Sequence, residues 1–107
     1  MDNLPKGMVR ACAGVVECVM FSSEQMSDHV RESVILAGEV VGKGFTAEAE
    51  LCRQHLVDAI RFNLANRRDY PIAALTRHFG LPVSEWTFIR EKQLYCAELA
   101  RRMMMTR

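Results

Sequence analysis

Apolar side chains recur every three or four residues along most of the chain, and this spacing constrains the fold more strongly than any other feature of the sequence. Met8, Cys12, Val15 and Val19, for example, fall on one face of a helix. A sheet would instead require alternating runs of apolar and polar residues, and the sequence contains no such run and no Asn-Gly hairpin turn. The spacing therefore predicts an all-α fold.

Glycine, proline and capping residues divide this pattern into five predicted helices. Gly42 and Gly80 end two of them, because glycine readily adopts the left-handed conformation that follows many helix C-termini. Ser22, with Gln25 three residues later, and Thr46 are predicted N-caps. The predicted helices span residues 6–21, 22–41, 46–65, 72–79 and 82–104. The inner face of the last helix is predicted to contain Trp86, Ile89, Gln93, Cys96, Ala97, Ala100 and Met103.

The length of the chain predicts one domain. Its 107 residues lie near the ~100–150 residues that are common for a single domain. We expect a compact bundle in which residues 1–66 supply core and dimerisation helices and residues 71–105 supply the functional segment. The first helix is apolar on most sides and the last is long, so both offer faces that a second copy could cover. The sequence therefore predicts a homodimer.

The four cysteines favour free thiols over a metal site. They are Cys12, Cys18, Cys52 and Cys96. No two form a CxxC pair, and no histidine has the spacing of a zinc ligand. Residues 8–21 are apolar, but Arg10 and Glu17 interrupt them, and the run is shorter than the ~20 residues that span a bilayer. We therefore expect a cytoplasmic protein with no membrane segment, no metal and no other cofactor.

The net charge of +1 conceals an uneven distribution along the chain. Residues 1–60 contain five basic and nine acidic side chains, whereas residues 61–107 contain nine basic and four acidic ones. This asymmetry favours an anionic partner for the C-terminal half. Attraction between the two halves, within one chain or across a dimer, would explain it equally well.

Residues 72–91, IAALTRHFGLPVSEWTFIRE, combine a short amphipathic helix, a glycine, a three-residue turn and a second helix. This segment, 20 of the 107 residues, resembles the helix-turn-helix of DNA-binding regulators. Gly80 lies where the turn needs a residue with positive φ, and Ser84 is placed to cap the second helix. Thr76 departs from the family pattern, which usually has a small residue such as alanine there. The crossing of the two helices requires apolar residues on the facing sides, here Leu75, Phe79, Trp86 and Ile89.

The resemblance implies a small DNA-binding transcription regulator that binds as a homodimer, with its second helix in the major groove. The residues that would then contact bases are Pro82, Val83, Ser84, Thr87, Phe88 and Glu91. Those that would contact phosphates are Arg67, Arg68, Arg77, Arg90 and Lys92.

A protein–protein adaptor or inhibitor that binds through an apolar helical surface is the alternative function. Glu85 and Glu91 would repel phosphates, and Phe88 suits a protein partner as well as a thymine methyl group. The orientation of Trp86 discriminates between the two functions. DNA binding requires Trp86 in the core and Phe88 among exposed arginines, whereas an adaptor requires both in an exposed apolar patch.

An enzyme is not expected from this sequence. The three histidines, His29, His55 and His78, are far apart along the chain. Cys52 and His55 share a helix face, but no local signature of a nucleophilic site surrounds them. We therefore assign no catalytic residue.

Overall fold

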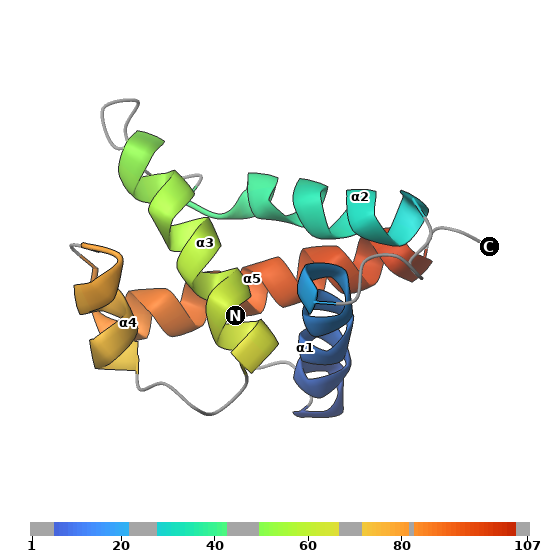
Figure 1. Cartoon of the computed structure of the whole chain (residues 1–107), viewed down its shortest axis with the longest axis horizontal. Helices are drawn as coiled ribbons and strands as arrows, with labels where there is room; N and C mark the ends of the chain where they lie inside the picture. Colours follow the sequence, from blue (N-terminus) through green and yellow to red (C-terminus); the bar gives the residue numbers. More distant parts are fainter. Residues whose placement is uncertain (1–5, 22–27, 43–49, 67–71, 82, 105–107) are drawn as a thin grey trace.

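The computed structural model describes residues 6–21, 28–42, 50–66, 72–81 and 83–104, and it confirms the predicted all-α fold (Figure 1). Within these ranges the regular elements are α-helices and one short 3-10 helix, with no strand. In chain order they are α1 (Lys6–Phe21), α2 (Asp28–Ala37), the 3-10 helix η2 (Gly38–Val40), α3 (Glu50–Asn66), α4 (Ile72–His78) and α5 (Glu85–Met104).

The long C-terminal helix α5 is the element on which the other helices are assembled. It contacts α1, α2, α3, α4 and η2. In Figure 1, α2 runs beside the C-terminal part of α5, and α4 lies at the N-terminal end of α5. α1 packs against α3 as well as α5. The largest fully buried side chains are Val16, Val41, Leu56, Ile60, Leu64, Phe88, Tyr95, Cys96 and Leu99.

The helical spacing of the sequence explains this core. In α3, Leu56, Ile60 and Leu64 follow one another every four residues and are all buried, because side chains four positions apart share a helix face. α1 likewise buries Cys12 and Val16. Among the described residues, no helix combines the length and the apolar character that crossing a membrane would require.

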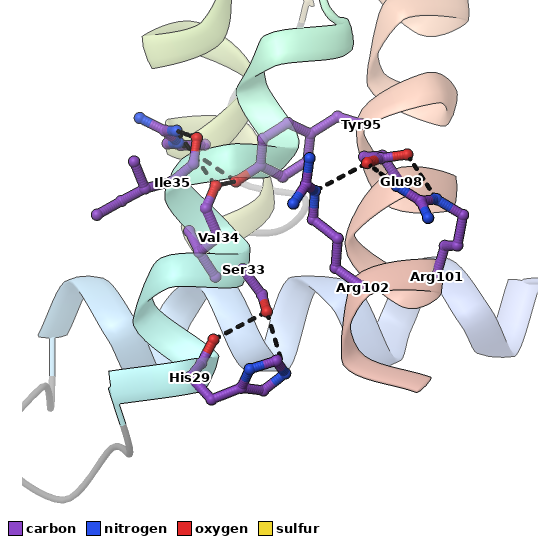
Figure 2. Close-up of polar contacts among 9 residues, drawn as sticks. His29, Ser33, Val34, Ile35, Tyr95, Glu98, Arg101 and Arg102 are labelled. Carbon is purple, nitrogen blue, oxygen red and sulfur yellow. Dashed lines mark hydrogen bonds and ion pairs between the residues drawn. The ribbon is translucent and has the colours of Figure 1, made fainter. Parts of the chain in front are cut away.

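The helix α2 ends earlier than the sequence predicts, at Ala37 rather than near Val41. Side chains from α3 and α5 bind its last carbonyls (Figure 2). Tyr95 Oη donates to the Val34 carbonyl at 2.8 Å, and Arg61 Nη2 donates to the carbonyls of Val34 and Ile35 at 3.2 and 3.1 Å. A cationic donor at a helix C-terminus satisfies exposed carbonyls and complements the helix dipole.

Gly42 ends this segment as predicted, with φ of 72°. Before it, η2 turns the chain away from the axis of α2, and Arg53 Nη1 donates to the carbonyls of Gly38 and Val41 at 3.2 and 3.3 Å. The predicted N-caps Ser22, Gln25 and Thr46 lie outside the described residues.

Candidate interaction surface at the corner of α4 and α5

A glycine-centred turn ends α4, as the sequence predicts. Gly80 has φ of 66°, its N–H donates to the Arg77 carbonyl at 3.3 Å, and the Leu81 N–H donates to the Thr76 carbonyl at 2.8 Å. This pair of bonds is a Schellman motif, which satisfies the last carbonyls of a helix and needs a residue with positive φ. Leu81 is buried beside it. The chain therefore has the helix, turn and second helix that its sequence indicates.

Ser84 caps the N-terminus of α5, also as predicted. The Thr87 N–H donates to Ser84 Oγ at 3.1 Å, and Ser84 Oγ donates to Thr87 Oγ1 at 3.1 Å. The Phe88 N–H donates to the Ser84 carbonyl at 3.0 Å, which begins the helical ladder. The hydroxyls of two predicted base-contacting residues are thus used to start the helix.

The inner face of α5 is not the one that the sequence predicts. Phe88 is 0% exposed and Glu91 is 4% exposed, so neither of these predicted base contacts lies on the surface of this fold. The Gly42 N–H donates to Glu91 Oε1 at 2.5 Å, which provides the buried carboxylate with a partner. Phe88, Glu91 and Tyr95 lie three or four residues apart and face the core.

Trp86 and Ile89, which the sequence places in the core, are instead 69% and 43% exposed. Glu85 and Arg90 are exposed as well. On a helix these four positions fall within one arc, opposite the buried side. We call Glu85, Trp86, Ile89 and Arg90 the α5 outer face. Cys96 is buried, and Ala100 and Met103 pack partly against the core, so these members of the predicted inner stripe are confirmed. Ala97, predicted in the same stripe, is exposed.

The predicted phosphate-binding residues have different surroundings. Arg77 and Arg90 are exposed, whereas Lys92 is half-buried and burial lowers its pKa. Arg67, Arg68 and the predicted base contact Pro82 lie outside the described residues. Val83, another predicted base contact, packs partly against the core.

The Arg90 side chain contacts two other residues of its own helix. Its guanidinium carbon lies 5.6 Å from the centre of the Trp86 ring, within the range of a cation–π contact. Its Nε lies 3.4 Å from Glu91 Oε2. The contact with Trp86 covers one side of an otherwise exposed indole with a positive charge, and sequence spacing alone did not indicate this arrangement.

A second candidate site is a pocket between α2 and the C-terminal end of α5. It has a volume of about 340 Å³ and is lined by His29, Glu32, Ser33, Leu36, Arg101 and Arg102. Figure 2 shows the Glu98 carboxylate between the two arginines, with Arg102 Nε 2.8 Å from Oε2. A hydrogen bond from Arg101, with the charges of Arg101 and Arg102, lowers the pKa of Glu98. The pairing of both arginines with one carboxylate reduces their attraction for an external anion.

Ser33 in this pocket does not resemble a catalytic serine. Its Oγ donates to the His29 carbonyl at 2.8 Å, so the hydroxyl proton is used by the helix backbone (Figure 2). His29 Nε2 lies 3.5 Å from the same oxygen, a long contact.

Comparisons with known proteins supply no relative. No family model, curated protein or solved structure matches the chain. Across the residues that the structure describes, no three His, Cys, Asp or Glu side chains are grouped so that they could hold a metal ion.

Proposed function

We propose that this chain acts by binding another protein through the α5 outer face and not by catalysis. The observation that carries the proposal is the exposure of Trp86 and Ile89 on one face of the helix beside Arg90. Tryptophan and arginine are the residues most enriched among those that dominate the affinity of protein interfaces. An apolar pair on DNA could contact little more than thymine methyl groups, whereas on a protein its whole area can be buried.

The order of side chains on the α5 outer face supports a second copy of the chain as the partner. When two such helices pack antiparallel about a two-fold axis between Thr87 and Phe88, Trp86 of each copy lies opposite Ile89 of the other. Glu85 and Arg90 lie on opposite edges of this apolar pair, because five residues correspond to about 140° around a helix. The face is therefore complementary to itself in apolar character, as a two-fold interface requires.

The size of the face indicates a weak dimer. Stable interfaces bury about 800 Å² on each partner, and two helical turns supply only part of that area. We expect reversible association with a Kd in roughly the micromolar range.

Substitution of the apolar pair tests this geometry. Ile89→Glu is expected to weaken self-association about tenfold or more, because it places a carboxylate against the partner's Trp86. Trp86→Ala is expected to weaken association by about 2 kcal/mol or more, roughly 30-fold. Sedimentation measures the dimer, and the emission of Trp86, the chain's one tryptophan, is expected to shift to the blue with concentration.

Matched substitutions elsewhere provide the control. Ile35 on α2 is 62% exposed, so Ile35→Ala and Ile35→Glu repeat the chemistry on another surface. Both are expected to leave association unchanged. Ile89→Glu and Trp86→Ala variants that associate as strongly as the parent would contradict the antiparallel geometry, and a parent that stays monomeric at every concentration would contradict the second copy as partner.

Duplex DNA is the second candidate partner, and the exposure of Arg77 and Arg90 favours it. These arginines come from the two helices of the helix-turn-helix corner, and the C-terminal half has an excess of basic residues. A transcription regulator of this kind would read DNA with the α5 outer face, because Phe88 and Glu91 are buried. DNA and a second copy would then compete for the same face.

Salt dependence tests DNA binding. If the parent binds a mixed-sequence duplex, its affinity is expected to fall steeply with salt, because bound arginines release counterions from the phosphates. Arg77→Ala and Arg90→Ala are each expected to reduce the slope of log K against log salt by about one. Arg10→Ala, an exposed arginine on α1, is the control. Absence of binding at low salt would eliminate this candidate and leave the protein partner.

A further inference from the structure

Two cysteines that are far apart in the sequence meet in the core. Cys12 of α1 and Cys96 of α5 are separated by 84 positions, and Cys12 Sγ donates to the Cys96 carbonyl at 3.4 Å. Both side chains are buried, and both are free thiols. The two cysteines form no sequence motif with each other, so only the packing of α1 on α5 brings them together.

The proximity of Cys12 and Cys96 makes the two thiols unequal. The hydrogen bond with Cys96 lowers the pKa of Cys12, whereas the same bond and burial raise the pKa of Cys96. Cys12 is therefore the thiol that ionises first, with Cys96 as the donor that stabilises its thiolate. Lys92, one turn before Cys96, adds a positive charge that favours a thiolate at Cys96 in a later step.

We propose that Cys12 and Cys96 are an oxidisable pair that forms a disulfide between α1 and α5 when the protein meets a hydroperoxide. The Cys12 thiolate attacks the peroxide, the O–O bond breaks, and Cys12 becomes a sulfenic acid while hydroxide leaves. The Cys96 thiolate then attacks the Cys12 sulfur, the S–O bond breaks, and a second hydroxide leaves. The two thiol protons convert both hydroxides to water, so two thiols are oxidised and one hydrogen peroxide is reduced.

Burial determines the course of this reaction. It slows the first step relative to an exposed thiol such as Cys18. It also favours the disulfide over further oxidation, because the sulfenic acid already contacts its resolving thiol. The product joins the first and last described helices, and a disulfide that closes so long a loop restricts the unfolded chain strongly.

Hydrogen peroxide applied to the folded Cys18→Ser/Cys52→Ser variant is the test, because only Cys12 and Cys96 remain in that variant. Digestion is expected to yield one linked peptide pair, lighter by two hydrogen atoms than its two free peptides, and dithiothreitol is expected to return the protein to the dithiol. The thermal midpoint of the oxidised protein is expected to rise by roughly 10 °C or more. Further replacement of Cys12 or Cys96 by serine is expected to abolish the link.

Two results would contradict the proposed disulfide between Cys12 and Cys96. One is a product in which Cys12 or Cys96 itself gains oxygen atoms without a link, because a neighbouring thiol would have resolved the sulfenic acid. The other is a four-cysteine parent that, oxidised while folded, links Cys12 or Cys96 to Cys18 or Cys52 instead. The unmutated parent supplies the second measurement in case the serine variants fold poorly, since circular dichroism and peptide mapping of its linked cysteines need no substitution.

Discussion

Replacing Phe88 with alanine is expected to lower the free energy of unfolding by about 3–5 kcal/mol, whereas Trp86→Ala is expected to change it by no more than about 0.5 kcal/mol. Phe88 is fully buried where α5 meets the rest of the core, so its truncation leaves a cavity. Trp86 lies on the surface, so its truncation removes little buried area. Urea unfolding followed by circular dichroism measures both values.

Phe88→Leu is the matched control for this comparison, because it keeps an apolar side chain and should lose less stability than Phe88→Ala. The reverse order, with Trp86→Ala much more destabilising than Phe88→Ala, would mean that α5 is rotated so that its predicted stripe faces the core. The stabilities of Phe88→Ala and Trp86→Ala, compared with each other, therefore show which side of α5 is buried.

Tyr95→Phe is expected to lower the free energy of unfolding by about 1–3 kcal/mol at neutral pH. The Tyr95 hydroxyl donates to the Val34 carbonyl and accepts from Arg61 Nε at 3.2 Å, so its removal leaves buried polar groups with fewer partners. Arg61→Met is the companion variant, because it keeps the apolar stem and removes the donors. A double-mutant cycle is expected to give a coupling between the two residues, and strict additivity would contradict the shared network.

The same tyrosine makes stability depend on alkaline pH. Burial raises the pKa of Tyr95, and the nearby Arg61 offsets only part of this effect. A folded-state pKa above the unfolded value of about 10 means that the contribution is fully present below pH 10 and is lost as pH rises through the folded pKa. Lys92, with its lowered pKa, acts in the opposite sense. The difference between the parent and Tyr95→Phe isolates Tyr95, and equal alkaline slopes in both would contradict its contribution.

The regular parts of the fold were predictable from local sequence. The bounds of α1, the stop at Gly80 and the cap at Ser84 depend on residues that are neighbours in the chain. The end of α2 was not predictable in this way, because the donors that bind its carbonyls come from positions 27 and 61 residues away from Val34. Contacts of that range are decided by tertiary packing.

The candidate surface was predictable in position but not in orientation. The helix, the turn and the second helix were expected between residues 72 and 91, but the wrong side of α5 was assigned to the core. The reason is that α5 has large apolar side chains on both sides, with Trp86 and Ile89 on one and Phe88 and Tyr95 on the other. Residue spacing alone cannot decide which of two apolar faces of a helix is buried. The carboxylate of Glu91 makes the face that is buried look polar in the sequence.

The central position of α5 has a consequence for the order in which this protein can be made. The helix leaves the ribosome after all the other described helices, yet every one of them packs against it. Until it emerges, the nascent chain exposes the apolar faces of α1, α2 and α3 without the element that covers them. Newly synthesised copies should therefore depend on chaperones until synthesis has passed α5, and stalling before that point should lead to aggregation.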